Sequence, residues 1–197
     1  MKLLLASRSE TRRLMLEQAG VPFETVAAPL DEEAAKAGLI AAGFEPLDLA
    51  EMLAEMKAKS VADAGDALVI GADQTLELDD GGLLNKPASR AEALDQLRRL
   101  SGTTHMLHSA AVLAERDERV WGETESVALT MRTLGEAFLA DYLDAEYEAI
   151  RWNVGGYLIE GRGAQLFERI EGSHFAILGL PLLPLLSGLR DRGLIAA

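Results

Sequence analysis

Hydroxyl and guanidinium side chains follow the first apolar run of the chain, Lys2–Ala6, which we expect to form a short buried strand. The segment SRSETRR comes directly after this run. Ser7 and Glu10 fit the capping pattern S-x-x-E, which predicts a helix over about Thr11–Ala19 that ends at Gly20. Free backbone N–H groups at a helix start attract anions, and hydroxyls and guanidiniums add bonds suited to phosphate.

Two arginines, Arg12 and Arg13, fall in the first turn of this predicted helix. A positive charge there opposes the helix dipole, so helix stability alone does not favour it. A capped surface helix with solvated arginines is the alternative interpretation. The placement of the two arginines favours a phosphate-binding turn.

Asp73 is a candidate for catalysis or metal binding. It stands in the segment GADQ, just beyond the apolar run Leu68–Ile70. Sites in α/β sheets usually form at the carboxyl ends of strands. A carboxylate there can bind a divalent metal or accept a proton from water. A turn aspartate without a catalytic role is the alternative.

Three further charged segments could contribute to such a site. Lys86 precedes Pro87, which favours an extended backbone, and a lysine held there could reach a phosphate. The acidic run at 31–33 could supply metal ligands. Glu160 places a charge within an apolar strand pattern, where it either faces solvent or binds a polar ligand. The alternatives are an exposed lysine and a solvated acidic loop.

Strand and helix patterns alternate along the chain, which favours the α/β class. Further strands are predicted at Phe23–Ala27, Leu68–Ala72, Thr75–Leu78, Leu83–Leu84, Met106–Ala114, Val127–Arg132, Tyr157–Ile159 and Gln165–Phe167. Helices are predicted at about Leu47–Asp63, after a Ser89 and Glu92 capping box up to Ser101, after a Thr133 and Glu136 capping box up to about Tyr147, and from about Leu182.

Composition sets the broad class. The chain has 197 residues, of which 49% are hydrophobic, enough for one domain or two intimate lobes. A net charge of −13 argues against long nucleic acid as a partner. The absence of cysteine excludes disulfides and cysteine nucleophiles. The first apolar run is too short for a signal peptide and no segment could span a membrane, so we expect a cytoplasmic protein.

In this order, the motifs resemble the Maf family, once called septum formation inhibitors. The matching segments are LLLASRSETRRLML, DE at 31–32, AEMKAKSVA, GADQ, KP at 86–87, LRRLSG, GYLIEGRGAQLFERIEGS and GLPL. The resemblance implies one domain over residues 1–197, with a mixed central sheet flanked by helices and a cleft between two lobes, similar to inosine triphosphate pyrophosphatases. It also implies a homodimer and a divalent cofactor, Mg²⁺ or Mn²⁺.

The resemblance further implies cleavage of a nucleoside triphosphate to its monophosphate and pyrophosphate. Asp73 would be the general base that activates water with help from the metal, and Glu32 would help to hold the metal. The residues implied to grip the triphosphate are Ser7, Arg12, Arg13, Lys57 and Lys86. Attack on phosphorus needs a stabilised leaving group and an oriented water, which cations and a carboxylate can supply.

Substrate choice is implied to follow Thr11, Gln74 and Glu160. Gln74 and Glu160 favour the branch that acts on 7-methyl-GTP. The Glu160 carboxylate can accept hydrogen bonds from the N1–H and the N2 amino group of guanine, and it favours the positively charged methylated ring. Thr11 matches neither this branch nor the one acting on dTTP and UTP. The sequence also departs from the family pattern at Glu10, where proline is usual, and at Asn85, where glycine is usual.

Two alternatives remain open at the level of sequence. Within the enzyme class, the chain could act on dTTP and UTP or clean up several noncanonical nucleotides, and a substrate panel separates these. In another class, it could be a nucleotide-binding regulator of septum formation. Replacing Asp73 by asparagine separates this class from the first, because only an enzyme would lose its cellular effect.

Overall fold

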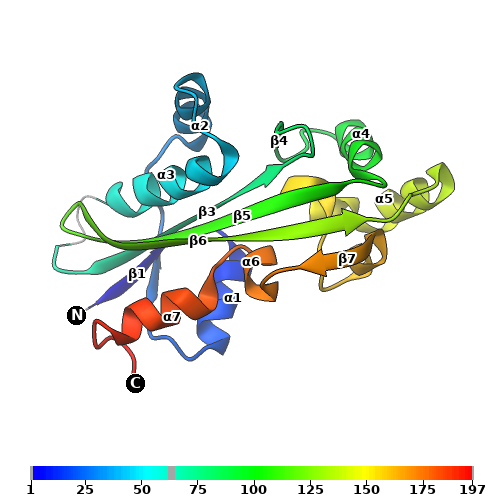
Figure 1. Ribbon diagram of the computed structural model, residues 1–197. Coiled ribbons are helices and arrows are strands. Elements are labelled where there is room, and N and C mark those ends of the chain that lie inside the picture. Colours follow the sequence, from blue (N-terminus) through cyan, green and yellow to red (C-terminus); the bar gives the residue numbers. More distant parts are fainter. Residues whose placement is uncertain (1, 62–64, 197) are drawn as a thin grey trace. The chain divides into compact units, whose positions relative to one another are not determined.

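The computed structural model describes residues 2–61 and 65–196 of the chain. Within these residues, seven strands form one sheet in the order β2-β1-β3-β5-β6-β7, with β4 pairing with β3 (Figure 1). The strands are β1 (Leu3–Ala6), β2 (Glu24–Val26), β3 (Leu68–Glu77), β4 (Leu83–Leu84), β5 (Thr104–Glu115), β6 (Glu118–Met131) and β7 (Phe167–Glu171). β1 runs parallel to β2 and β3, whereas the β3–β4 and β6–β7 pairs are antiparallel. The sheet is mixed, and the predicted α/β class is confirmed.

Helices flank the sheet, and the chain divides into two compact units. The helices are α1 (Glu10–Gln18), α2 (Glu32–Ala41), α3 (Pro46–Lys59), α4 (Arg90–Leu100), α5 (Glu136–Ile150), α6 (His174–Ile177) and α7 (Leu182–Arg190), with short 3-10 helices η1 (Val154–Gly156) and η2 (Arg162–Leu166). The first unit comprises 1–74, 108–126 and 173–197, and the second comprises 75–107 and 127–172. No helix in the described part of the chain is long and apolar enough to cross a membrane.

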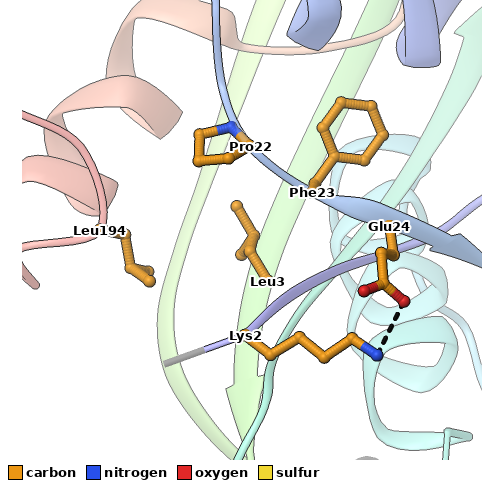
Figure 2. A pocket seen from close by; sticks show the side chains of 6 residues that line it. All are labelled: Lys2, Leu3, Pro22, Phe23, Glu24 and Leu194. Atoms are coloured by element: carbon orange, nitrogen blue, oxygen red, sulfur yellow. Dashed lines mark ion pairs between the residues drawn. The ribbon is translucent and has the colours of Figure 1, made fainter.

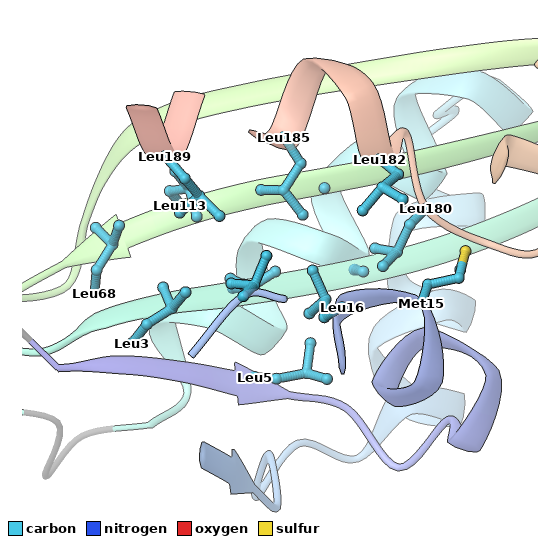
Figure 3. Close-up of a cluster of buried hydrophobic side chains, with 14 residues drawn as sticks. Leu3, Leu5, Met15, Leu16, Leu68, Leu113, Leu180, Leu182, Leu185 and Leu189 are labelled. Atoms are coloured by element: carbon cyan, nitrogen blue, oxygen red, sulfur yellow. The ribbon is translucent and has the colours of Figure 1, made fainter. Parts of the chain in front are cut away.

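Both faces of β1 are buried in the first unit. Leu3 and Leu5 join a hydrophobic cluster with leucines of α1 and α7, drawn in Figure 3. Leu4 and Ala6 pack on the opposite face against alanines of α3. A strand covered on both faces has a continuous apolar sequence instead of an alternating one, which is why this strand was recognisable from its residues.

Gly71 allows α3 to lie directly against β3. A Cβ atom at this position would meet Ala54 O at 2.0 Å and Ala58 N at 2.6 Å, so no larger residue fits without moving the helix. Small residues on the helix complete this close approach. The last turn of α3 carries Lys57 and the strand carries Asp73 two residues after Gly71. The sequence of this contact therefore brings a lysine beside an aspartate.

In the second unit, hydrogen bonds to aromatic hydroxyls hold the segment after α5. The hydroxyl of Tyr157 lies 2.8 Å from His105 Nε2, and its ring meets that of Phe167 edge-on at 4.9 Å between centroids. Tyr142 donates from its hydroxyl to Gly156 O at 3.2 Å. These contacts fix the chain just before the turn that contains Glu160.

The first helix does not begin with the predicted capping box. Ser9 is the N-cap of α1, because its Oγ accepts from the backbone N–H of Arg12 at 3.3 Å. Ser7 Oγ instead accepts from the backbone N–H of Ser9 at 3.2 Å. The helix therefore begins at Glu10, and Gly20 follows its end with a φ of 70°, as predicted.

β3 is longer than the sequence predicts. The runs Leu68–Ala72 and Thr75–Leu78 belong to one strand that ends at Glu77, so Asp73 lies inside it and not beyond its end. The polar pair at 73–74 interrupts the apolar pattern without interrupting the strand. The turn at 79–82 connects β3 to β4 as predicted.

Two predicted strands are absent from the structure. Tyr157–Ile159 is irregular, and Gln165–Phe167 mostly belongs to η2, so β7 begins only at Phe167. Just before the first of these segments, Gly155 and Gly156 have φ values of 79° and 67°, which glycine adopts readily. Glu160 consequently lies in an exposed turn and not in a strand.

The remaining predictions differ mainly at element ends. Ser89 caps α4 as predicted, its Oγ accepting from the N–H of Glu92 at 3.1 Å. α5 has Gly135 as N-cap without a side-chain bond, so the predicted Thr133 cap is wrong. β2, β5, β6 and α7 confirm four predicted elements, with β5 and β6 longer than predicted. α3 ends at Lys59, and the predicted end at Asp63 lies outside the described residues.

Candidate active site

The ammonium group of Lys57 meets two carboxylates in the first unit. Its Nζ lies 2.8 Å from Asp73 Oδ1 and 3.1 Å from Glu32 Oε2. The side chain of Lys57 is 6% exposed, that of Asp73 18% and that of Glu32 53%. A buried lysine is stable only with such partners, because desolvation of an unpaired charge is costly. The two predicted metal ligands, Asp73 and Glu32, therefore form one cluster with a predicted triphosphate ligand, Lys57.

Each member of this cluster comes from a different element. Asp73 lies within β3, Lys57 in the last turn of α3, and Glu32 is the first residue of α2. Asp31 is the N-cap of α2, and its Oδ1 accepts from the N–H of Ala34 at 3.0 Å. The acidic run at 31–33 is therefore a helix start and not a loop. The cap fixes where α2 begins and therefore places Glu32 at its first position.

Arg12 is buried beside the same cluster. Its Nε donates to Gly179 O at 2.8 Å and its Nη1 donates to Ala72 O at 2.9 Å. Burial lowers the pKa of Arg12, and the charges of Asp73 and Glu32 act in the opposite direction. A guanidinium has five N–H groups and stays protonated, so these two bonds fix the side chain while leaving donors for an anion.

Arg13 points elsewhere, although it is the next residue. Its guanidinium forms ion pairs with Glu10 and Glu17 along the outer side of α1, with Nε 2.9 Å from Glu10 Oε2. Hydrogen bonds to Glu10 and then Glu17 raise the pKa of Arg13, and the bond to Arg13 lowers the pKa of Glu10. The structure therefore separates the two predicted phosphate ligands into a buried and a paired arginine.

The turn before α1 supplies two serine hydroxyls. Ser7 and Ser9 each accept one backbone N–H bond within the turn, so their positions are set by the chain itself. Thr11 lies in the first turn of α1 and is partly buried. A hydroxyl that accepts from the backbone keeps its own O–H for a further acceptor such as a phosphate oxygen.

Gln74 follows Asp73 on β3, and its side-chain amide is held by three acceptors of the first unit. Nε2 lies 2.8 Å from Ser109 Oγ, 2.9 Å from Ala176 O and 3.1 Å from Ile177 O. Sequence patterns do not reveal Ser109, because it is one polar residue inside an apolar strand. Gly179 is easier to recognise from the sequence, because it stands in the GLPL segment. In the structure it adopts a φ of 101°.

Two predicted site residues, Lys86 and Glu160, belong to the second unit. Lys86 is exposed in the loop between β4 and α4, with Pro87 buried behind it. The carbonyl of Asn85 accepts from Gln96 Nε2 at 3.1 Å, which fixes the backbone before the lysine. Glu160 is exposed in the turn after Ile159.

The donors present fit a magnesium-like cation, although the described residues hold no group of three or more histidines, aspartates or glutamates suited to a metal. Glu32 and Asp73 converge on one positive charge, the Lys57 ammonium. Mg²⁺ commonly takes one or two carboxylates together with substrate phosphates and water. Two converging carboxylates are therefore a sufficient protein contribution for such an ion.

A separate pocket of about 300 Å³ lies where β1 and β2 begin (Figure 2). Its lining residues are Lys2, Leu3, Pro22, Phe23, Glu24 and Leu194. Lys2 and Glu24 form an ion pair there at 2.7 Å. None of the predicted site residues lines this pocket, which opens at the start of β1, whereas Ser7 follows the end of that strand.

Comparisons with known proteins give one consistent result. Residues 2–192 match the family described as Maf-like protein. A relative from Sphingopyxis alaskensis, named nucleoside triphosphate pyrophosphatase, is 49% identical over 195 residues, covering 98% of each chain. A relative from Rhizobium meliloti, named 7-methyl-GTP pyrophosphatase, is 49% identical over 196 residues, covering 99% of this chain and 98% of that protein. The solved structure of a HAM1 protein from Coxiella burnetii shares the fold, with a TM-score of 0.50 at 12% identity over 95% of this chain and 99% of that chain.

Proposed function

This chain belongs to the Maf-like protein family, and we propose that it hydrolyses a nucleoside triphosphate to the monophosphate and pyrophosphate. The predicted family resemblance is confirmed by the family match over residues 2–192 and by relatives at 49% identity. The predicted enzyme class, a nucleoside triphosphate pyrophosphatase, is the one for which these relatives are named.

The observation that carries the proposal is the cluster of Lys57, Asp73 and Glu32 with Arg12 buried beside it. Pyrophosphate release needs positive charge for the leaving group and a carboxylate that orients water. The cluster provides both within one unit. It also joins a buried strand to two helices, so the charged groups are held by packing as well as by their own attraction.

Asp73 is the proposed general base. The bond from Lys57 fixes its carboxylate, and a carboxylate has enough lone pairs to accept a water proton as well. Ser7, Arg12, Arg13, Lys57 and Lys86 are the proposed triphosphate ligands. Of these, Arg12 is the most rigidly placed, because two backbone carbonyls hold its guanidinium.

Glu32 and Asp73 are the proposed ligands of a divalent cation, Mg²⁺ or Mn²⁺. Such an ion would neutralise phosphate charge and polarise the phosphorus that is attacked. Lys57 then has a second use, since its ammonium holds the two carboxylates together in the absence of the ion. A cation that binds both carboxylates has to compete with Lys57, which makes this lysine a candidate to turn toward the substrate.

The proposed base preference is 7-methyl-GTP, through Thr11, Gln74 and Glu160. A relative named for that activity has the same identity, 49%, as one with the general name, so the comparison favours neither. The support is chemical: Glu160 is an exposed carboxylate, which can accept from guanine N–H groups and attract a methylated, positively charged ring. A preference for dTTP and UTP, or a broad activity, is the alternative.

We further propose that residues 1–197 form a single Maf-like domain and that the protein is a cytoplasmic homodimer. We propose neither a membrane nor long nucleic acid as a partner. The net charge of −13 supports the exclusion of nucleic acid. A nucleotide-binding regulator of septum formation remains the second candidate function, and the resemblance to septum formation inhibitors is what favours it.

A substrate panel tests the proposed function. Purified protein with Mg²⁺ or Mn²⁺ would be supplied with dTTP, UTP, CTP, GTP and 7-methyl-GTP, and pyrophosphate and monophosphate would be quantified. The proposal expects equal amounts of both products and the highest kcat/KM for 7-methyl-GTP. Release of inorganic phosphate and a nucleoside diphosphate instead would contradict cleavage between the α- and β-phosphates. No turnover of any nucleotide would favour the regulator.

A further inference from the structure

We propose that Ser109 is a positioning residue that fixes the amide of Gln74, so that only the carbonyl oxygen of Gln74 can face a nucleotide base. The inference rests on the proposed function, in which Gln74 contributes to base preference. It assigns a role to Ser109 and a direction of hydrogen bonding to Gln74. Neither residue needs to touch the phosphates for this role.

The amide of Gln74 uses its whole donor capacity within the first unit. Its NH₂ group has two hydrogens and faces three acceptors, Ser109 Oγ, Ala176 O and Ile177 O, at 2.8, 2.9 and 3.1 Å. Backbone carbonyls can only accept, so the nitrogen and not the oxygen of the amide must point toward them. The orientation of this side chain is therefore determined by its surroundings.

Ser109 closes this arrangement. It is fully buried on β5, and its hydroxyl donates to Ala176 O at 2.6 Å while accepting from Gln74 Nε2. The single O–H of Ser109 thus donates to the Ala176 carbonyl, and a lone pair of its oxygen accepts from the Gln74 amide. Removing the hydroxyl takes away one acceptor of the amide and one donor to Ala176 at the same time.

The side chains of Gln74 and Ser109 bind carbonyls at the end of α6. Carbonyl oxygens at the end of a helix lack partners within the helix, and α6 has only four residues, His174–Ile177. Gln74 donates to the carbonyls of Ala176 and Ile177, and Ser109 donates to that of Ala176, which also accepts from the backbone N–H of Gly179 at 3.0 Å. The contact connects β3, β5 and α6 next to Asp73.

An acceptor at position 74 selects a class of base. Guanine, 7-methylguanine, uracil and thymine present an N–H at the centre of their Watson–Crick edge, whereas cytosine and adenine present a bare nitrogen there. A fixed Gln74 Oε1 accepts a hydrogen bond from the N–H of guanine, uracil or thymine. With cytosine or adenine, the same oxygen would face the lone pair of the bare nitrogen, which is repulsive. An amide free to rotate could donate to the second group as well, so the fixing of Gln74 becomes a basis for discrimination.

Kinetics on Ser109→Ala test this role. We expect the ratio of kcat/KM for 7-methyl-GTP over CTP to fall by about fivefold or more, the value of one hydrogen bond, mainly through KM. Ser109→Cys keeps a weak donor and should fall between wild type and Ser109→Ala. Ser126→Ala is the control for loss of a serine hydroxyl in the first unit, because exposed Ser126 makes a side-chain bond to His108 Nδ1 at 2.7 Å and belongs to no proposed role.

A second measurement does not depend on activity. The side-chain NH₂ signals of Gln74 in an ¹⁵N-correlated NMR spectrum are assigned by their loss in Gln74→Met, and their hydrogen exchange with water is measured. We expect slow exchange in wild type and in Ser126→Ala, and faster exchange in Ser109→Ala. If Ser109→Ala does not fold, Ser109→Cys carries the same comparison.

The outcomes separate the inference from the proposed function. A uniform loss for all nucleotides in Ser109→Ala, or fast exchange of the Gln74 amide in wild type, would overturn the role of Ser109. If wild type turns over no nucleotide, the proposed function fails, and the base-selecting part of the inference fails with it. Slow exchange that Ser109→Ala abolishes would in that case still establish the fixed amide.

Discussion

Lys57 Nζ lies 2.8 Å from Asp73 Oδ1 and connects the last turn of α3 to the middle of β3. Glu32 reaches the same ammonium at 3.1 Å from the start of α2. The lysine is nearly buried, while Glu32 is about half exposed, so the cluster is open to ligands on its acidic side. The arrangement gives Lys57 a structural role beside its proposed role in catalysis, and measurements of stability and of activity follow the two separately.

Lys57→Met should reduce both stability and activity. Loss of the ammonium leaves Asp73 and Glu32 facing each other without a counter-charge. We expect a cost of about 1–3 kcal/mol in the free energy of unfolding, less than for a fully buried pair because Glu32 is half exposed. Pyrophosphate release should fall by about 100-fold. Urea unfolding and steady-state kinetics measure the two effects.

Lys59→Met serves as the control for this variant. Lys59 lies on the same helix and pairs with Glu55, but it is more exposed than Lys57 and belongs to no proposed role. Its replacement should change the free energy of unfolding by less than about 1 kcal/mol. Equal losses in the two variants would show that Lys57 contributes nothing beyond an ordinary surface ion pair.

The adjacent arginines should respond differently to the same substitution. Arg12→Lys removes the bonds to Ala72 O and Gly179 O, so we expect lower stability by about 1–3 kcal/mol together with a large loss of kcat/KM. Arg13→Lys keeps a charge near Glu10 and Glu17, so it should not change stability measurably. It should raise KM, because Arg13 is a proposed triphosphate ligand. Thermal unfolding beside kinetics checks both. Equal destabilisation by the two variants would contradict the distinction.

Gly179→Ala should disturb Arg12. A Cβ atom there would lie 3.2 Å from Arg12 Nε, and the φ of 101° already strains any L side chain. Gly193→Ala is the matched control, since Gly193 has a φ of 69° and a Cβ atom added to it would meet nothing within 4 Å. We expect both variants to lose about 1 kcal/mol from backbone strain, and only Gly179→Ala to lose activity as well. Full activity in Gly179→Ala would argue against a function for the Arg12–Gly179 bond.

His105 should make stability depend on pH in the acid range. Burial lowers the pKa of His105 to about 4 from 6.5, and its Nδ1 has no partner among the described residues that could accept a proton from it. Between these values the unfolded chain binds a proton that the folded chain does not, so stability is complete above pH 6.5 and is lost as pH falls toward 4. The loss amounts to about 3 kcal/mol at most.

Urea midpoints between pH 4 and 7 would measure this effect in wild type, His105→Gln and His174→Gln. His105→Gln should show a smaller decline than wild type, because its side chain does not titrate. His174 is exposed, so His174→Gln should follow wild type. Parallel curves for wild type and His105→Gln would assign the acid sensitivity to the carboxylates instead.

Much of the fold was predictable because local signals and burial agree. β1 has a continuous apolar sequence and is buried on both faces, and Ser89 caps α4 as its spacing indicates. The misplaced cap of α1 shows the limit of such reasoning. Ser7 and Ser9 both precede the helix, and only backbone geometry decides that Ser9 accepts the bond from Arg12.

The candidate site was predictable in its members but not in its contacts. Motif resemblance names Glu32, Lys57 and Asp73, yet no spacing along the chain shows that one ammonium joins them. The role of Gly71 in bringing α3 to β3 depends on a contact between distant segments. Ser109 is invisible for a related reason, because a small polar residue in a buried strand has no pattern of its own.

The most direct test of the account is pyrophosphate release by Asp73→Asn, with Asp66→Asn as the control. Asp66 is 82% exposed and pairs only with Arg116 in the described structure, so its loss should leave turnover unchanged. Asp73→Asn should still fold, because asparagine keeps an acceptor oxygen for Lys57 and Glu32 keeps a counter-charge. It should lose at least about 100-fold in kcat for every nucleotide tested, as expected for removal of a general base. Turnover within about threefold of wild type, well below the effect of losing such a base, would contradict the assignment of Asp73 as the catalytic residue.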